Sequence, residues 1–213
     1  MTKIIKTESI DSTNTYCKNL LSNHDCLSDN YCEKNITLPI AVIASEQYAG
    51  RGCYGKSFFS PKDCGIYLSY AFEDDYEQAE LQRLTIVAAA VVHQVLQAHC
   101  LEELQIKWIN DIYRGSRKIA GILTERIADP CCPGKHYIII GIGTNVYPCV
   151  VPEDLDGIVG FLADSISNPS LLKDIRQELI EMLERVFVKE QKENFPVLIN
   201  YYRNHCRNLP EGF

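Results

Sequence analysis

The chain has 213 residues, of which 46% are hydrophobic, and a formal net charge of −7. This length and composition allow a buried core and predict a single globular domain spanning residues 1–213. The acidic charge argues against broad binding to nucleic acid or to an anionic membrane surface, and no run of about 18 apolar residues is present to span a bilayer. We therefore expect a cytoplasmic protein with no nucleic-acid or membrane partner, in which any anion site is local.

The cysteines give little sign of a metal or redox role. There are ten, none paired as C-x-x-C, and the five histidines do not lie at zinc-ligand spacings beside them. The N-terminal residues also lack the apolar run of a signal peptide. We therefore predict no protein metal site and mostly reduced thiols, with the adjacent Cys131 and Cys132 as the exposed pair.

The first predicted elements are a short helix and five strands. The helix lies in residues 11–21, where Ser12 or Thr13 can accept hydrogen bonds from the free amides of the first turn. A long irregular loop follows at residues 22–35. Runs of β-branched and aromatic residues that end in turn residues predict the strands. These are Leu38–Gln47, Gly65–Phe72, Leu104–Trp108, Lys118–Ile127 and His136–Val146.

Two longer helices are marked by apolar residues at helical spacing. One lies within residues 78–100, and the other starts near Leu172 and continues through Val186. Each should place one face on the sheet, and the short links between residues 118 and 146 favour antiparallel strands. The expected fold class is α+β, a mixed and largely antiparallel sheet with helices packed against it.

A glycine-rich loop, AGRGCYGKSFFSP at residues 49–61, is the first candidate binding site. Glycines allow the main chain to approach a ligand, successive N–H groups can hold an anion, and Arg51 adds a permanently charged planar group. The loop has neither the P-loop pattern nor the dinucleotide pattern. A phosphate or carboxylate site is one interpretation, and a surface turn with an isolated arginine is the other.

A second candidate is the stretch IKWINDIYRGSRKIAGILTE, residues 106–125. We expect one strand to present Lys107, Trp108, Asn110 and Asp111, and the turn RGSR to reverse the chain. Lys118 then leads a returning strand in which Gly121 leaves space. This hairpin would place an amide, a carboxylate and an ammonium near one ligand, although a solvated hairpin explains the same pattern.

The third candidate is GIGTNV, residues 141–146, at the end of an apolar strand. Gly141 and Gly143 lie on one face of that strand, which indicates that a helix or a ligand packs flat against the backbone. Asn145 offers both a donor and an acceptor, as needed to read a nucleobase edge, although an asparagine that ends a strand in a turn is common.

Taken in order, these motifs resemble those of the biotin protein ligase family. The resemblance runs from IDSTN, residues 10–14, through EQYAGRGCYGKSFFSP, KWINDI and RKIAGILTE to GIGTNV, and covers most of the chain. It implies the fold shared by class II aminoacyl-tRNA synthetases and biotin ligases. It also implies formation of biotinyl-5′-AMP from biotin and ATP with Mg²⁺, and transfer of biotin to a lysine of a biotin carboxyl carrier protein.

The resemblance also implies the site residues. The biotin site would comprise Ser12, Thr13, Asn14, Gln47, Gly50, Arg51, Gly52, Cys53, Lys118, Gly121, Gly141 and Gly143. The ATP site would comprise Lys56, Phe58, Asn110 and Asn145, with Phe58 where the family usually has a tryptophan against adenine. The catalytic residues would be Lys118 and Arg51, which meet the carboxylate and α-phosphate, and Asp111, which orients or deprotonates the acceptor lysine.

The chain departs from the family pattern in two motifs and at both ends. Cys53 replaces the second arginine of the loop, which predicts weaker retention of the adenylate, and Ile109 stands where proline is usual. The first residues leave no room for the DNA-binding domain of some members, and the chain ends where many relatives begin a small β-barrel domain. We therefore expect a catalytic core alone, as a monomer or homodimer.

Two other functions remain open at this point. A lipoate or octanoyl ligase shares the fold, but the ordered GRG, KWIND and KIAG motifs disfavour it. A non-catalytic biotin- or nucleotide-binding protein would explain the replacement of the loop arginine by Cys53. Exchange of pyrophosphate into ATP, measured with biotin, with lipoate and with neither, distinguishes these functions.

Overall fold

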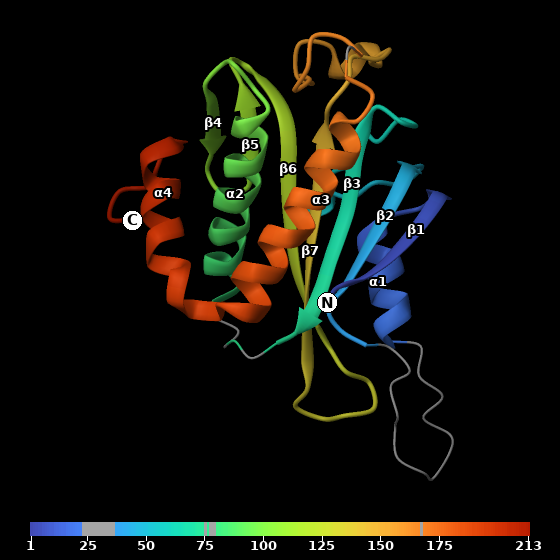
Figure 1. The fold of residues 1–213 in the computed structure, drawn as a ribbon, viewed down its shortest axis with the longest axis vertical. Helices are drawn as coiled ribbons and strands as arrows, with labels where there is room; N and C mark the ends of the chain where they lie inside the picture. Colours follow the sequence, from blue (N-terminus) through green and yellow to red (C-terminus); the bar gives the residue numbers. More distant parts are fainter. Residues whose placement is uncertain (23–36, 75, 77–79, 167) are drawn as a thin grey trace.

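The computed structural model describes residues 1–22, 37–74, 76, 80–166 and 168–213. Within them, eight strands form one sheet in the order β1-β2-β3-β7-β6-β5-β4-β8 (Figure 1). The strands are β1 (Lys3–Ile10), β2 (Ile40–Gln47), β3 (Gly65–Glu73), β4 (Leu104–Lys107), β5 (Asp111–Arg114), β6 (Arg117–Ala128), β7 (His136–Asn145) and β8 (Cys206–Arg207). The two outer pairs, β1·β2 and β4·β8, are parallel and the other neighbours are antiparallel. The predicted mixed, largely antiparallel sheet is confirmed.

The five predicted strands correspond to β2, β3, β4, β6 and β7. The expectation of one continuous strand from Lys107 to Asp111 is wrong. The first strand ends at Lys107, residues 108–110 form a turn, and Asp111 begins the separate strand β5. Strand β1 was also missed, because its side chains are mostly exposed or half-buried and it is fixed mainly by backbone pairing with β2.

Helices cover both faces of the sheet (Figure 1). They are α1 (Thr13–Ser22), α2 (Leu81–Ala98), α3 (Leu171–Glu184) and α4 (Phe195–His205), with a π-helical turn at Arg185–Lys189 after α3. Alternation along β2 shows how the faces divide: Ile40 and Val42 pack in the core cluster of α1, whereas Ala41 and Ile43 pack in that of the other three helices. The two predicted long helices are thus confirmed as α2 and α3.

The start of α1 differs from the predicted capping. Tyr16 N donates to the backbone carbonyl of Ser12, and the Thr13 hydroxyl donates to Gln47 rather than closing the first turn. Helix α4 was not predicted, although Pro196 lies in its first turn, where its fixed φ and missing N–H are tolerated. Most of the predicted loop at residues 22–35 lies outside the described residues.

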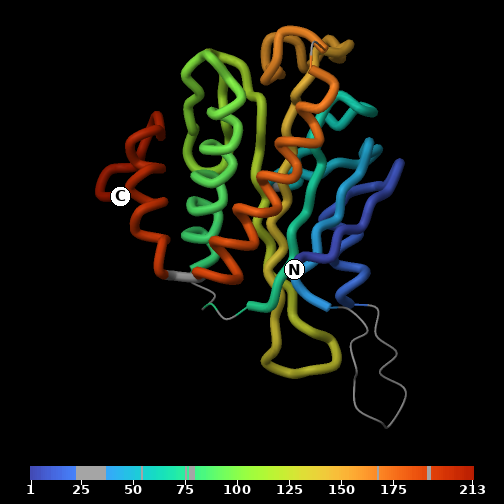
Figure 2. The backbone as a smooth tube through the Cα atoms, viewed as in Figure 1, coloured from blue at the N-terminus to red at the C-terminus, as the bar shows by residue number. Residues whose placement is uncertain are grey.

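The cysteine prediction holds in part. Cys17, Cys53, Cys64, Cys100, Cys132, Cys149 and Cys206 are free thiols, but Cys131 is disulfide-bonded, so the expectation of a reduced thiol is wrong at that residue. None of the helices in the described parts of the chain has the length and hydrophobicity needed to cross a bilayer. Figure 2 traces the same course of the backbone as a tube, from the N-terminus to the C-terminus.

Candidate active site

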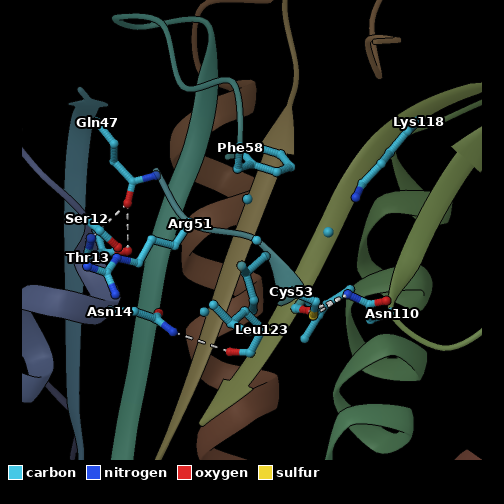
Figure 3. Close-up of a pocket in the computed structure, with 16 residues that line it drawn as sticks. Ser12, Thr13, Asn14, Gln47, Arg51, Cys53, Phe58, Asn110, Lys118 and Leu123 are labelled. Atoms are coloured by element: carbon cyan, nitrogen blue, oxygen red, sulfur yellow. Dashed lines mark hydrogen bonds between the residues drawn. The ribbon is translucent and has the colours of Figure 1, made fainter. Parts of the chain in front are cut away.

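The predicted motifs meet in one cavity between the glycine-rich loop and the strands β6 and β7 (Figure 3). The chain segments before α1, after β2 and at the start of β6 all reach it, although they are far apart in sequence. It is lined by Ser12, Thr13, Asn14, Gln47, Arg51, Gly52, Cys53, Phe58, Asn110, Lys118, Gly121, Ile122, Leu123, Gly141, Ile142 and Gly143.

Gln47 organises one end of this cavity. Its side-chain oxygen accepts hydrogen bonds from the backbone N–H of Thr13 at 2.8 Å and from the Thr13 hydroxyl at 3.1 Å. Its amide nitrogen donates to the hydroxyl of Ser60 at 2.9 Å, and that hydroxyl donates to the carbonyl of Phe58. The Gln47 amide therefore links the start of α1 to the end of the glycine-rich loop.

Asn14 forms the adjacent part of the cavity wall. Its amide nitrogen donates to Glu125 Oε2 at 2.8 Å, and its side-chain oxygen accepts from the Ser69 hydroxyl, which also lies 2.7 Å from the Thr13 hydroxyl. A Cβ atom at Gly141 would lie 2.2 Å from Asn14 Oδ1. Glycine at position 141 is therefore required by the close approach of Asn14.

Sequence reasoning missed Ser69 and Glu125. Ser69 is a fully buried hydroxyl residue within the apolar run of β3, and a polar residue on a buried strand face is the signal that could have identified it. Glu125 also binds Lys18 of α1 at 2.6 Å. Ser69 thus holds both Thr13 and Asn14 in place, and Glu125 holds Asn14.

Phe58 covers the second glycine of the β7 motif. A Cβ atom at Gly143 would lie 2.5 Å from the ring, and one at Gly121 on the neighbouring strand would lie 3.5 Å from it. The predicted flat packing against this face is thus provided by two side chains of the chain itself, Asn14 over Gly141 and Phe58 over Gly143. The absence of side chains at Gly121 and Gly143 leaves room for the aromatic ring of Phe58.

A second cavity begins on the other side of Phe58 and Lys118, which line both cavities. Of the predicted residues, Lys56, Asp111 and Asn145 lie here rather than in the first cavity. The wall of the second cavity is apolar where Leu155, Ile158 and Val159 contribute to it. The two cavities are therefore adjoining compartments that meet at one aromatic ring and one ammonium group.

Lys118 and Asp111 form an ion pair at this junction. Lys118 Nζ lies 2.6 Å from Asp111 Oδ1, and both side chains are about three-quarters buried, with exposed fractions of 28% and 23%. Lys118 Nζ also lies 5.9 Å from the centre of the Phe58 ring. The ammonium is therefore held at the boundary between the cavities by a carboxylate and an aromatic face.

Arg51 reaches the first cavity from the side opposite Lys118, and its side chain extends toward Ser12 and Asn14 (Figure 3). Gly50 does not line the cavity. A Cβ atom there would lie 2.6 Å from the Phe58 carbonyl, so the glycine permits the loop to fold back on itself. Gly50 is thus a support of the loop rather than a lining residue.

Cys53 takes part in a contact between the loop and β6. Asn110 Nδ2 donates to the Cys53 sulfur at 3.1 Å and to the Ile122 carbonyl at 2.8 Å, and the thiol lies 3.8 Å from that same carbonyl. Burial, followed by the nearby Asp111 carboxylate, raises the pKa of the Cys53 thiol. The thiol is therefore neutral and supplies no positive charge to the cavity.

Comparison with known proteins places this arrangement in a family. The profile described as "Biotin/lipoate A/B protein ligase family" matches residues 7–145, more than half of the chain. The Bifunctional ligase/repressor BirA of Bacillus spizizenii is 29% identical over 189 residues, covering 89% of this chain and 57% of its own length. The biotin–acetyl-CoA-carboxylase ligase of Mycobacterium tuberculosis is 30% identical over 178 residues, covering 81% and 62%. The chain thus spans about three-fifths of the length of these two relatives.

The fold comparison agrees with the sequence comparison. The structure of the biotin protein ligase from Aquifex aeolicus in complex with biotin and ATP matches with a TM-score of 0.68 at 24% identity. That match covers 92% of this chain and 76% of the other. At this identity the similarity concerns the fold, and it confirms the predicted biotin ligase architecture. On the family match and on the convergence of its motifs in one cavity, the chain belongs to the biotin/lipoate A/B protein ligase family.

Proposed function

We propose that this chain is a biotin protein ligase. It joins biotin to ATP as biotinyl-5′-AMP and then transfers biotin to a lysine of a biotin carboxyl carrier protein in the cytoplasm. The observation that carries the proposal is the pair of adjoining cavities that meet at Lys118. A ligase of this kind must hold an acid and a nucleotide end to end, with a cation where the two anions meet.

The first cavity suits biotin better than lipoate or octanoate. A ureido ring presents one strong acceptor and two N–H donors, and Ser12, Thr13, Asn14 and Gln47 present hydroxyl and amide groups at one end of the cavity. An acyl chain that lacks the ureido group would form fewer hydrogen bonds with these groups and would therefore bind less well. The polar end of the cavity thus favours biotin over the other acids of the family.

Arg51 and Lys118 would neutralise the reacting anions. The biotin carboxylate must attack the α-phosphorus of ATP, and an approach between two anions is slow unless fixed cations offset the repulsion. Lys118 can meet that carboxylate and the α-phosphate at the junction of the cavities, and Arg51, whose side chain extends toward Ser12 and Asn14, would have to turn toward Lys118 to hold the carboxylate. The attacking oxygen forms the new P–O bond as pyrophosphate leaves, and burial of the mixed anhydride in the cavity would keep water from it.

The second cavity is the proposed nucleotide site. Phe58 can stack on adenine, Asn145 can pair with its edge, and Lys56 can meet a phosphate. Mg²⁺ would accompany ATP, since this ion is usually held by one or two carboxylates together with substrate phosphates and water. Asp111 is the carboxylate suited to hold it here. The bound ion would stabilise negative charge on the phosphates.

The transfer step assigns a second task to Asp111. An attacking lysine must be neutral, so its ammonium has to lose a proton to a nearby base before it forms the amide bond and releases AMP. Asp111 lies at the junction where the acyl phosphate would form, and its carboxylate can orient the lysine or accept that proton. Lys118, its present partner, is then free to hold the departing phosphate.

A carrier assay tests the complete function. The purified chain is incubated with biotin, MgATP and a biotin carboxyl carrier domain, and the intact mass of the carrier is measured. We expect a mass increase of one biotinyl group, and none on a carrier whose acceptor lysine is replaced by arginine. An unmodified carrier in the presence of all substrates would contradict the proposal.

A further inference from the structure

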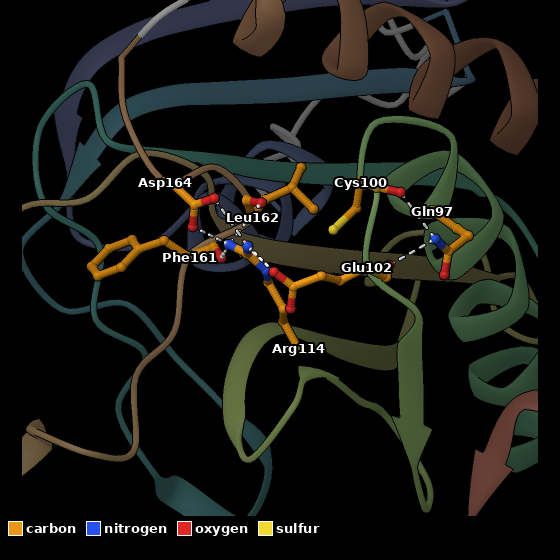
Figure 4. Close-up of polar contacts among 7 residues, drawn as sticks. All are labelled: Gln97, Cys100, Glu102, Arg114, Phe161, Leu162 and Asp164. Carbon is orange, nitrogen blue, oxygen red and sulfur yellow. Dashed lines mark hydrogen bonds and ion pairs between the residues drawn. The ribbon is translucent and has the colours of Figure 1, made fainter.

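Arg114, the last residue of β5, joins three parts of the chain (Figure 4). Its guanidinium donates to both carboxylate oxygens of Asp164, at 2.7 and 3.2 Å, and to the carboxylate of Glu102. It also donates to the backbone carbonyls of Phe161 and Leu162 at 3.3 and 3.4 Å. Its side chain is only 17% exposed, whereas those of Asp164 and Glu102 are 84% and 60% exposed.

The segment that Arg114 holds leads directly to the second cavity. Ile158 and Val159, which precede Phe161 by three and two residues, form part of the cavity wall, and Leu155 lies shortly before them. Backbone hydrogen bonds fasten this stretch to β6, since Lys118 N donates to Ile158 O at 2.9 Å and Gly160 N donates to Lys118 O at 2.8 Å. The wall of the proposed nucleotide site is therefore attached to the backbone of Lys118 itself.

The far end of the same segment is attached to β7. Leu162 N donates to Asn145 O at 3.0 Å, and Ala163 N donates to Val146 O at 2.9 Å. Asn145 lines the same cavity. Arg114 donates to the carbonyls of Phe161 and Leu162, next to these backbone attachments, and so holds the segment against β5.

We propose that Arg114 is a positioning residue for the nucleotide site. By binding the carbonyls of residues 161 and 162 and the Asp164 carboxylate, it fixes residues 155–164 so that Ile158 and Val159 stand against the nucleotide beside Lys118 and Asn145. The inference rests on the proposed function of the second cavity. It predicts that loss of Arg114 weakens the binding of ATP but not the binding of biotin. Apart from Lys118, none of these residues lines the first cavity.

Arginine has the geometry that this task requires. Its planar group has five N–H donors and can bind a carboxylate and two carbonyls at once, whereas lysine is a single point charge that can meet only some of them. Hydrogen bonds to Asp164 and Glu102 raise the pKa of Arg114 further above its usual range, so its charge is permanent. The exposure of the two acidic partners weakens each ion pair, but Arg114 binds both carboxylate oxygens of Asp164, and these bonds act together with the carbonyl contacts in the positioning.

The test compares Arg114→Ala and Arg114→Lys with the unchanged protein. Hydrogen bonds to a charged group are worth about tenfold or more in an equilibrium constant, and ATP would have to bind against a cavity wall that lacks them. We therefore expect Arg114→Ala to raise the KM for ATP by about tenfold and to leave the KM for biotin within about twofold of its original value. Arg114→Lys should recover part of the loss. The matched control is Arg203→Ala, which removes the same charge from α4 and should leave both KM values unchanged.

Amide hydrogen exchange provides a readout that does not depend on activity. In the ligand-free protein, Arg114→Ala should speed exchange at residues 158–163 and leave the core of β3 unchanged. Equal increases in both KM values, or unchanged exchange at residues 158–163, would overturn the inference. Failure of the proposed function would show instead in the unchanged protein, which would neither bind MgATP in calorimetry nor support exchange of pyrophosphate.

Discussion

Lys118 lies where the two cavities adjoin, paired with Asp111 across 2.6 Å. Removing the ammonium by Lys118→Ala should slow adenylate formation about 30- to 1,000-fold, because a charge-assisted contact that strengthens in the transition state is worth about 2–4 kcal/mol. The measurement is biotin-dependent exchange of pyrophosphate into ATP.

The control for that prediction is Lys62→Ala. Lys62 is an exposed lysine that lies 4.0 Å from the exposed Glu8 and lines neither cavity, so its loss removes the same charge away from both cavities. Its exchange rate should match that of the unchanged protein. A correctly folded Lys118→Ala variant with an undiminished rate would remove Lys118 from the catalytic assignment.

Asp111 has two proposed tasks that separate in time. Asp111→Asn keeps the shape of the side chain but removes the charge and most of its capacity to accept a proton. If Asp111 serves the acceptor lysine, transfer to the carrier should slow more than adenylate formation does. Single-turnover measurements of the two half-reactions distinguish the tasks. If adenylate formation slows at least as much as transfer to the carrier does, Asp111 is assigned to Mg²⁺ and the phosphates.

Cys53 stands where the resemblance to the family leads us to expect an arginine. Its neutral thiol contacts Asn110 and Ile122 and cannot form the charge-assisted bond that arginine would make to an adenylate phosphate. Such a bond is worth about 1.5–3 kcal/mol, so Cys53→Arg should slow release of the adenylate about ten- to a hundredfold. The measurement is the rate of adenylate release, together with stray biotinylation of bystander lysines.

Cys53→Ser is the matched control, because it keeps a small polar group without adding charge. It should release the adenylate about as fast as the unchanged protein. Equal retention by the unchanged protein and by Cys53→Arg would show that another cation already holds the phosphate. Lys56, which lies in the second cavity, would be the first candidate.

Among the elements, α2 carries a buried group that makes stability depend on pH. His93 is fully buried, and its Nε2 lies 3.0 Å from the Leu104 carbonyl, which can only accept, so the proton lies on Nε2. Its Nδ1 then accepts from the Tyr201 hydroxyl at 2.9 Å. Burial lowers the pKa of His93; His205 nearby lowers it further, while the Leu104 carbonyl and Glu103 oppose the shift.

The sign of the effect follows from the protonation of the two states. Below about pH 6.5, the usual pKa of histidine, the unfolded chain binds a proton at His93 that the folded chain does not. Stability should therefore fall as pH decreases from about 6.5 toward the lowered pKa of the folded state, by at most about 1.4 kcal/mol per pH unit. Above that range His93 contributes no pH dependence.

Chemical denaturation between pH 5 and 7.5 measures this slope. His93→Gln should be less stable at neutral pH but should lose part of the acid-dependent slope, whereas His136→Gln, at a half-buried histidine outside the core, should retain it. A slope that is unchanged in His93→Gln would show that other groups cause the loss of stability in acid.

The elements of this fold differ in how far the sequence alone could predict them. Strands β3 and β7 are buried over nearly their whole length, and their apolar runs predict them directly. Strand β1 has mixed, exposed side chains and exists because β2 offers it a backbone partner. The turn at residues 108–110 was missed because the run from Leu104 to Asp111 contains no glycine or proline to mark it.

The residues of the candidate site also differ in how far the sequence alone could predict them. Polar and charged residues such as Gln47, Arg51 and Lys118 could be proposed as site residues from the motifs, and they do meet in the first cavity. Contacts between segments far apart in sequence decide which residues line which cavity. The same kind of contact gives Ser69, Glu125 and Arg114 their supporting roles. Such contacts leave no local pattern from which they could be predicted.

On the scale of the whole molecule, the sheet brings two compartments to one ammonium group. Strand β7 supplies Gly141 and Gly143 to the first compartment and ends at Asn145 in the second, while Lys118, the second residue of β6, lies between them. This layout would place an acid and a nucleotide end to end, as activation of an acid by ATP requires. A ligase for another acid would use lipoate or octanoate in place of biotin. A binding protein without catalytic activity would show no turnover.

Exchange of labelled pyrophosphate into ATP tests this account most directly. The purified chain is assayed with MgATP and either biotin, lipoate, octanoate or no acid, because only reversible formation of an acyl adenylate returns the label to ATP. We predict exchange with biotin that is lost when Mg²⁺ is removed, and only background exchange in the other three reactions. Equal exchange with lipoate or octanoate, or none with biotin, would contradict the assignment of this chain as a biotin ligase.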